Sequence, residues 1–172
     1  MSLAHSDVDG VLSNFSEHLL DTVGSSLSPE EITDWDIFKF LTPDQLHHAQ
    51  AMLKEFDWWT SLPVMEGAQD GVEYLRSSGY RITWVTAPWK SCPTWKQARR
   101  VWIDKHFPGD EELIVTSDKH EYPADVFWDD KPTNVLTYRD VHPDRKCFVF
   151  DAPYNRHVEG PRISWATIRD YL

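Results

Sequence analysis

The sequence contains little cysteine and no long apolar run. Its two cysteines, Cys92 and Cys147, are too few and too far apart for a disulfide framework or a zinc knuckle. We therefore expect reduced thiols in a cytoplasmic protein. No apolar stretch approaches the roughly 20 residues that cross a bilayer, and no basic segment followed by an apolar one opens the chain, so we expect no membrane partner.

Basic residues are also scarce. The chain has 17 lysines and arginines against 28 acidic residues, which gives a net charge of -11. Binding to a nucleic-acid polymer requires a basic face that neutralises phosphates, so this balance argues against such a partner. A small phosphorylated molecule is still compatible with it, because a local cation site can overcome the overall field.

The remaining composition is typical of one globular domain. Hydrophobic residues make up 41% and charged residues 26% of the 172 residues, which allows a core of its own and one small inserted subdomain. The nine tryptophans are unusual. Most of them should lie in the core, although four stand in partly polar stretches: Trp35, Trp58, Trp59 and Trp89.

Short apolar or β-branched runs that end in polar residues recur along the chain. Such runs are typical of parallel strands that are covered on both faces. We place the weakly apolar segment 3–6 in the sheet because of the motif that follows it. The predicted strands are 3–6, 80–85, 112–115, 126–128 and 146–150, with helices at 68–78 and 93–106. This alternation predicts an α/β fold with a Rossmann-like parallel sheet of about five strands.

Residues 15–62 follow a different pattern. Helical stretches are predicted at 14–23 and 43–56, with a short one at 35–40 and no convincing strand. A helical block directly after the first strand indicates a small cap over a site on the α/β core. We therefore predict a core made of residues 1–14 and 63–172 and a helical cap made of residues 15–62.

The first candidate site is the motif Asp7-Val8-Asp9-Gly10-Val11-Leu12. Two carboxylates two residues apart at a strand end project to one side, and Gly10 allows a sharp turn there. One carboxylate could attack a substrate while the other transfers a proton. An acidic turn without chemistry is an alternative. A calcium loop is another, although no glutamate completes its pattern.

Further polar residues follow the other predicted strands. Thr86 could hold phosphoryl oxygens and Lys119 could supply a cation. The adjacent Asp129 and Asp130 require neutralisation by a cation or by solvent. Each feature alone also has a structural explanation, as a strand-end hydroxyl, an exposed lysine or a capped turn. Neighbouring parallel strands end at one crevice, however, and there the set would supply what phosphoryl transfer requires.

This order of motifs resembles the haloacid dehalogenase superfamily of phosphotransferases. Within that superfamily the chain is similar to the 5'(3')-deoxyribonucleotidases over nearly its whole length. The similarity is carried by residues 7–15, by Thr86-Ala87-Pro88-Trp89-Lys90, by the helix 96–107, by Thr116-Ser117-Asp118-Lys119 and by Trp128-Asp129-Asp130-Lys131-Pro132. The resemblance implies a helical cap, a Mg2+ cofactor and hydrolysis of nucleoside monophosphates, often with deoxy sugars preferred.

The resemblance also implies roles for the acidic residues. Asp7 corresponds to the nucleophile, which is also a metal ligand. Asp9 corresponds to the general acid/base, which binds the metal through its backbone carbonyl. Asp129 and Asp130 match the acidic metal-binding pair, and which of the two coordinates directly is left open.

Substrate contacts are implied at other positions. Thr86 and Lys119 match the phosphate-binding pair, and we also assign Ala87 and Lys90 of the same motif to the substrate site. Ala87 is a departure, because mammalian-type enzymes have a serine there whose hydroxyl contacts phosphate. Losing that contact would weaken transition-state binding by about 1–3 kcal/mol, while the backbone amide remains. Phe15 is our candidate for a nucleobase pocket, with packing of the cap as the alternative role.

We therefore expect a Mg2+-dependent phosphatase that acts on a small nucleotide through a phospho-aspartate intermediate. Action on another small phosphomonoester is the alternative among enzymes. A non-catalytic nucleotide-binding protein is the alternative outside them. A homodimer, the preferred base, the sugar and the position of the phosphate are left open.

Overall fold

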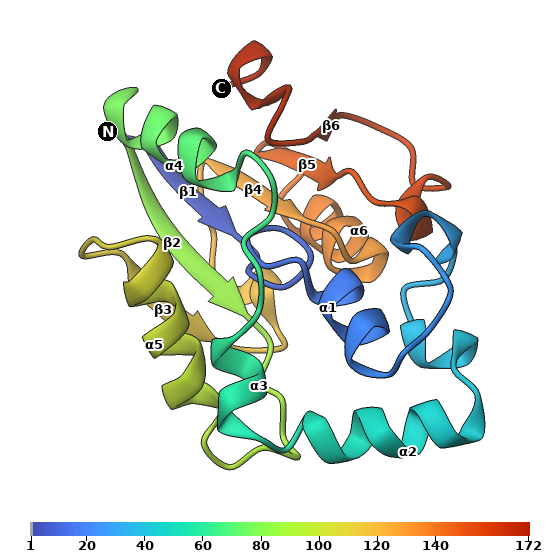
Figure 1. The fold of residues 1–172 in the computed structure, drawn as a ribbon. Coiled ribbons are helices and arrows are strands. Elements are labelled where there is room, and N and C mark those ends of the chain that lie inside the picture. The colour runs from blue at the N-terminus through green and yellow to red at the C-terminus, as the bar shows by residue number, and fades with distance from the viewer. Residues whose placement is uncertain (1) are drawn as a thin grey trace.

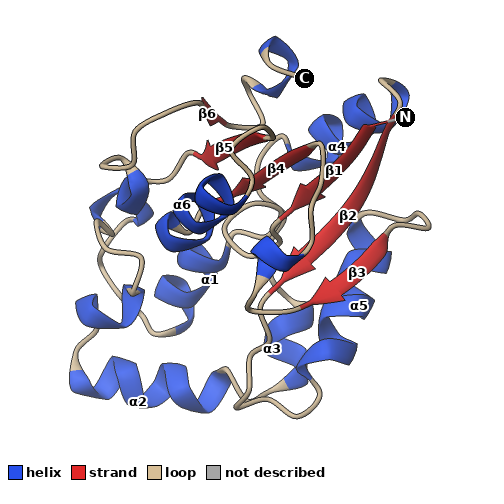
Figure 2. Cartoon of the chain, turned by 180° about the vertical axis from the view of Figure 1, so that it is seen from behind, coloured by secondary structure: helices blue, strands red, loops and turns tan. Residues whose placement is uncertain are grey.

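The computed structural model describes residues 2–172, which contain a six-stranded sheet with helices on both faces (Figures 1 and 2). All neighbouring strands are parallel, in the order β3-β2-β1-β4-β5-β6. The strands are β1 (Ser2–Ser6), β2 (Tyr80–Thr86), β3 (Glu112–Val115), β4 (Val126–Asp129), β5 (Lys146–Phe150) and β6 (Arg162–Ile163). The opposite views place α4 (Ala68–Ser77) and α5 (Trp95–His106) on one face and α6 (Pro132–Val141) on the other.

The central strands are apolar because both of their faces are covered. Strand β1 lies between β2 and β4, with Ala4 opposite both Ile82 and Val126. Every residue of β4 is buried, and so are the large side chains of Trp84 and Trp128. The edge strand β3 is less buried. This arrangement explains why the central strands read as continuous apolar runs in the sequence.

The predicted α/β fold with a parallel sheet is confirmed, and the sheet has six strands where about five were expected. The additional strand β6 has two residues, which is too short to produce a hydrophobic pattern. The sequence pattern also does not predict α6, because Val135 and Tyr138 are its buried residues and the rest of the helix is polar or exposed.

The insertion of helices after the first strand is confirmed. Between β1 and α4 the described chain forms α1 (Phe15–Thr22), η1 (Pro29–Glu31), η2 (Ile37–Phe40), α2 (Pro43–Met52) and α3 (Phe56–Thr60). The single helix expected over 43–56 is wrong, because α2 ends at Met52. The indole N–H of Trp59 donates to the carbonyl of Leu53 at 3.0 Å and so occupies an oxygen that a continuing helix would use.

These inserted helices lie beyond the carboxyl ends of β1 and β2 (Figure 1). They are fastened to the sheet-containing part at several points. Helix α3 packs against α5, and the indole N–H of Trp102 on α5 donates to the carbonyl of Leu62 at 2.7 Å. At the other side, Glu30 pairs with Arg156 at 2.9 Å. The insertion therefore lies over the edge of the sheet where the candidate site residues are expected.

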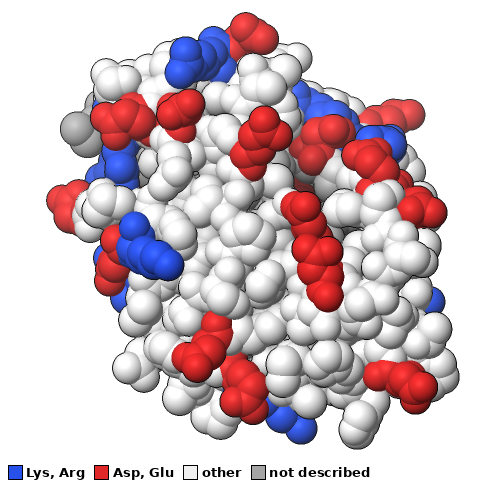
Figure 3. Space-filling view, viewed as in Figure 1, with Lys and Arg blue, Asp and Glu red and all other residues white. Residues whose placement is uncertain are grey.

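The surface reflects the excess of acidic residues. Figure 3 shows Asp and Glu scattered over one face, with Lys and Arg between them and no continuous basic band across that face. A face of this kind gives no track for a phosphate backbone. Among residues 2–172, no helix combines the length and apolarity needed to cross a membrane.

Candidate active site

The Asp7 loop is held tightly against β4. Asp7 follows β1 directly, and its backbone N–H donates to the carbonyl of Trp128 at 3.2 Å. The loop turns back at once, because the N–H groups of Leu12 and Ser13 both donate to the carbonyl of Val8. Gly10 has φ +79°, a conformation that other residues rarely adopt. This turn brings the acidic motif beside the end of the neighbouring strand.

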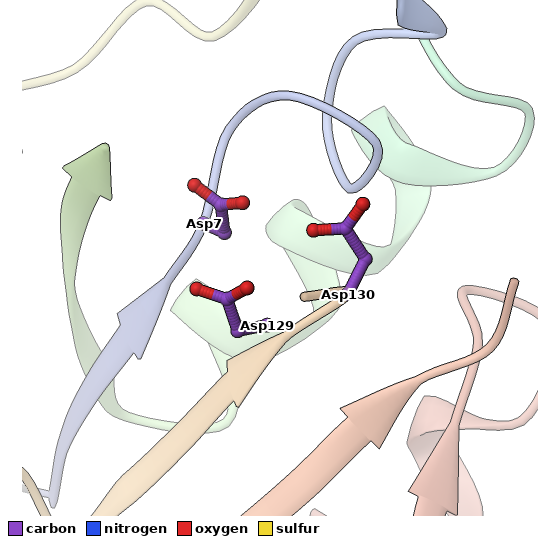
Figure 4. Close-up of side chains that lie close together, drawn as sticks. All are labelled: Asp7, Asp129 and Asp130. Carbon is purple, nitrogen blue, oxygen red and sulfur yellow. The ribbon is translucent and has the colours of Figure 1, made fainter. Parts of the chain in front are cut away.

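Three carboxylates meet between the ends of β1 and β4. The structure brings together Asp7, Asp129 and Asp130, with one ligand oxygen from each lying within 4.8 Å of the others. Figure 4 shows the three side chains directed into one gap between the two strand ends. All three are buried, at 7%, 0% and 4% exposure respectively. Oxygen ligands clustered in this way suit a hard divalent cation.

Lys119 is the cation of this cluster. Its ammonium group lies 2.5 Å from Asp7 Oδ1 and 2.7 Å from Asp129 Oδ2, and the side chain is buried. Burial alone would lower the pKa of Lys119, but the charges of Asp129 and Asp7 outweigh it and raise this pKa. Lys119 therefore stays charged. It does not have the exposed position that is ordinary for a lysine.

One lysine does not neutralise three buried carboxylates. Burial, followed by the charge of Asp129, raises the pKa of Asp7 to about 6, against the opposing effect of Lys119. Burial and the charges of Asp7 and Asp129 also raise the pKa of Asp130 well above its usual value. Negative charge on all three carboxylates is therefore unfavourable in the gap unless a further cation binds there.

The two adjacent aspartates have different partners. Asp129 accepts hydrogen bonds on both oxygens: Oδ1 from the N–H of Lys131 at 2.8 Å, and Oδ2 from Lys119 and from the Asn134 amide at 2.9 Å. Asp130 Oδ2 accepts from the hydroxyl of Tyr154, and among the described residues Oδ1 has no hydrogen-bond donor. Asp130 is therefore the member of the pair with an oxygen available to a metal.

Asp9 points to a different set of partners. Its Oδ1 lies 2.6 Å from Nη2 of Arg99 and accepts a hydrogen bond from the hydroxyl of Ser13 at 2.8 Å. Asp9 lines the same cavity as Asp7. The two carboxylates of the first motif therefore reach one space from different surroundings, as a nucleophile and an acid/base require.

A cavity of about 270 Å3 opens above these groups. Of the residues expected to contact substrate, Phe15, Thr86, Ala87 and Lys119 line this cavity. Thr86 ends β2 and is buried, whereas Ala87 is exposed. The exposed Lys90 is not among the lining residues, so the structure does not bring it to the cavity.

The upper wall of the cavity is aromatic. Its aromatic lining residues from the insertion and from the loop after β2 are Phe15, Trp35, Phe38, Trp59 and Trp89. The rings pack against one another: the ring centroid of Trp59 lies 5.9 Å from that of Phe15 and 5.6 Å from that of Trp89. Phe15 thus packs inside the insertion and also faces the cavity. The two roles considered for it from the sequence are both compatible with its place.

Sequence reasoning missed several residues that support the site. Tyr154 and Asn155 belong to η4 (Pro153–Asn155), and Asn155 donates to the carbonyl of Asp130 at 2.7 Å. Both residues follow closely after the end of β5, and this position near a strand end could have identified them as candidates. Arg99 lies in the middle of α5, where no feature of the sequence marks it.

Comparison with known proteins agrees with this geometry. The profile of the family described as 5' nucleotidase, deoxy (pyrimidine), cytosolic type C protein matches residues 2–172. The mouse protein "5'(3')-deoxyribonucleotidase, mitochondrial" is 29% identical over 137 residues, covering 73% of this chain and 60% of that protein. The chain therefore spans about three fifths of the length of that relative.

Solved structures share the fold. A HAD-superfamily hydrolase from Geobacter sulfurreducens has a TM-score of 0.55 at 14% identity and covers 100% of both chains. D,D-heptose 1,7-bisphosphate phosphatase from B. bronchiseptica, in complex with magnesium and phosphate, has a TM-score of 0.57 at 13% identity and covers 99% of this chain and 97% of its own. Such identities show the fold alone. The family match over residues 2–172 establishes that the chain belongs to the family described as 5' nucleotidase, deoxy (pyrimidine), cytosolic type C.

Proposed function

We propose that this protein is a Mg2+-dependent phosphatase that hydrolyses nucleoside monophosphates, with deoxyribonucleoside 5'- or 3'-monophosphates preferred, through an acyl phosphate on Asp7. The observation that carries the proposal is one cavity with two unlike ends. Its floor holds the carboxylates and Lys119, which suit a phosphate with a metal ion, and its wall is aromatic, which suits a nucleobase. The family match supports the same substrate class.

The donor set fits Mg2+. This ion prefers oxygen ligands and retains several waters. Asp7 and Asp130 would hold it directly, together with the backbone carbonyl of Asp9. Asp129 would not bind it directly, because both of its oxygens already accept hydrogen bonds from protein donors. The raised pKa values of Asp7 and Asp130 support a cation there, because ionised carboxylates in the gap are unfavourable without one. When bound, the ion would stabilise charge on the phosphoryl oxygens.

Two steps then follow from the positions of the aspartates. In the first step an oxygen of Asp7 attacks phosphorus and the bond to the ester oxygen breaks, while Asp9 gives its proton to that leaving oxygen. In the second step a water attacks the phosphorus of the phospho-aspartate, the bond to Asp7 breaks, and Asp9 takes the proton of the water. The hydroxyl of Thr86, the N–H of Ala87 and the ammonium of Lys119 would hold phosphoryl oxygens throughout.

The cavity limits the size of the substrate. Small-molecule sites are commonly about 300–1,000 Å3, and this cavity of about 270 Å3 lies just below that range. We propose that residues 15–62 act as a cap that encloses a mononucleotide and excludes bulk water. Phe15, Trp59 and Trp89 would then contact the base. The cytoplasmic location, which we expect because Cys92 and Cys147 resemble no disulfide framework in the sequence, stays a prediction. The homodimer also stays a prediction.

A substrate panel tests the proposal. Rates would be measured on the eight common ribo- and deoxyribonucleoside 5'-monophosphates, on matched 3'-monophosphates, on sugar phosphates and on a 5'-phosphorylated oligonucleotide, with and without chelator. We expect Mg2+-dependent turnover of mononucleotides and little turnover of the oligonucleotide. Faster turnover of sugar phosphates than of nucleotides would show that sugar phosphates are the substrate class. Absence of hydrolysis of every compound, with Mg2+ present, would refute the catalytic proposal and leave a binding protein.

A further inference from the structure

A buried arginine lies behind the proposed acid/base. Arg99 on α5 is 0% exposed, and its Nη2 lies 2.6 Å from Asp9 Oδ1. The two residues are 90 positions apart in the sequence. Among residues 2–172, Asp9 is the ion-pair partner of Arg99. An arginine with so little access to water is held in place by what surrounds it, and here three tryptophans surround it.

These tryptophans form a cage around the guanidinium. The Cζ atom of Arg99 lies 5.3 Å from the ring centroid of Trp59, 5.7 Å from that of Trp95 and 5.6 Å from that of Trp102. Arginine stacks favourably on aromatic faces. Nε and Nη1 of Arg99 have no hydrogen-bond acceptor among the described residues, so the rings and one carboxylate fix this side chain. The single polar contact that the cage leaves is directed at Asp9.

The contact engages one oxygen of Asp9. Oδ1 accepts hydrogen bonds from both Arg99 and the hydroxyl of Ser13, whereas Oδ2 has no donor among the described residues. We propose that Arg99 is a positioning residue: it anchors Oδ1 so that Oδ2 is the oxygen that gives and takes the proton in the cavity. This inference rests on the proposed function. It assigns Arg99 no contact with substrate.

The cage also connects the cavity wall to the acid/base. Trp59 comes from α3 in the insertion and lines the cavity, and the same indole lies against Arg99. Positioning of Asp9 therefore depends on a residue that we propose to contact the base. Displacing a catalytic group by about 1 Å can cost on the order of 10²-fold in rate. Loss of Arg99 should accordingly act on kcat more than on KM.

A purely structural role would predict a different outcome, in which Arg99 fills space and its loss affects folding alone. Arg99→Met keeps a long side chain among the three rings and removes the contact with Asp9. Arg99→Lys keeps a cation near Asp9 with a single donor group. Arg100→Met is the matched control, since Arg100 is the neighbour on α5 that pairs with Asp104 and lies outside the cage.

The experiment compares these variants with the parent protein, with folding checked by circular dichroism. With the best nucleoside monophosphate, we expect kcat to fall by about 10- to 100-fold in Arg99→Met and by less in Arg99→Lys, with KM within about threefold. With 4-nitrophenyl phosphate, whose leaving group needs no proton, phospho-Asp7 should accumulate in the same order and be visible by mass spectrometry after acid quench. Arg100→Met should behave as the parent.

The outcomes separate the two proposals. If the parent protein hydrolyses nucleotides and neither folded Arg99 variant accumulates phospho-Asp7 or loses kcat, this inference is overturned and the proposed function stands. If Arg99→Met does not fold, the Arg99→Lys comparison decides by the same two readouts. If the parent protein hydrolyses none of the compounds with Mg2+ present, the proposed function fails.

Discussion

Gly10 provides a sharp test of how the site is packed, because it combines an unusual backbone with a close approach. Its φ is +79°, and a Cβ built on it would overlap Oδ2 of Asp130 and lie 2.9 Å from Cγ of the same residue. It would also lie 3.0 Å from the hydroxyl oxygen of Tyr154. Gly10→Ala therefore strains the loop and displaces a proposed metal ligand from its hydrogen-bond partner.

The magnitude has two parts. A left-handed conformation costs a residue with a Cβ about 1–2 kcal/mol. Separating Asp130 from Tyr154 breaks a buried hydrogen bond to a carboxyl group, which contributes about 1.5–3 kcal/mol. We expect Gly10→Ala to lower the free energy of unfolding by about 2.5–5 kcal/mol, as measured by urea denaturation in the presence of chelator.

Gly79→Ala is the matched control. Gly79 has φ +84°, but a Cβ there would meet nothing within 4 Å. Gly79→Ala should lower the free energy of unfolding by the backbone strain alone, about 1–2 kcal/mol, and should keep the activity of the parent protein. Equal losses of stability in the two variants, with equal activity, would refute the idea that the glycine turn is fitted to Asp130.

The other predictions concern the chemistry of the site and one thiol. Chelator should abolish activity and Mg2+ should restore it, and full activity of metal-free protein would contradict the proposed mechanism. Asp7→Asn should form no phospho-enzyme, whereas Asp9→Asn should slow turnover by about 10²- to 10⁴-fold and trap phosphate on Asp7 when 4-nitrophenyl phosphate is the substrate. Phe15→Ala should lower kcat/KM for nucleotides by about 10- to 100-fold, through lost stacking, but leave hydrolysis of acetyl phosphate nearly unchanged; parallel losses would remove Phe15 from the base pocket. Burial raises the pKa of Cys147 from 9.0 to about 11, so this thiol should resist alkylation at pH 8, and the stability it contributes should be lost as the pH rises from about 9 to 11.

The sequence predicts those site residues that stand at strand ends. Asp7 follows β1, Thr86 ends β2 and Asp129 ends β4, while Lys119 begins η3 shortly after β3. Apolar runs locate buried parallel strands, and topology then brings the ends of such strands to one edge. Two pieces of one-dimensional information, the run and the polar residue after it, are therefore enough to predict most of the acidic cluster.

Other parts of the site depend on packing between distant segments. Arg99 belongs to an Arg-Arg pair on a helix, and only the tertiary structure distinguishes it from Arg100, whose side chain is 40% exposed. Tyr154 likewise approaches Asp130 across 24 positions, from a short 3-10 turn that has no periodic pattern. The aromatic wall is a similar case, since Trp59 is buried and Trp35 is exposed although both occur in partly polar stretches. No local sequence rule separates these cases.

The Asp129-Asp130 pair shows why identical neighbours need not have the same role. Three donors from two different segments converge on Asp129: the ammonium of Lys119, and the N–H of Lys131 and the amide of Asn134 at the start of α6. Asp129 thereby joins the end of β4 to the next helix and holds Lys119 close to Asp7. Asp130 accepts a hydrogen bond from Tyr154 on Oδ2, and among the described residues its Oδ1 has no donor. We infer that the first carboxylate organises the site and that the second is the one presented to the cation, a division set by which donors the fold brings to each oxygen.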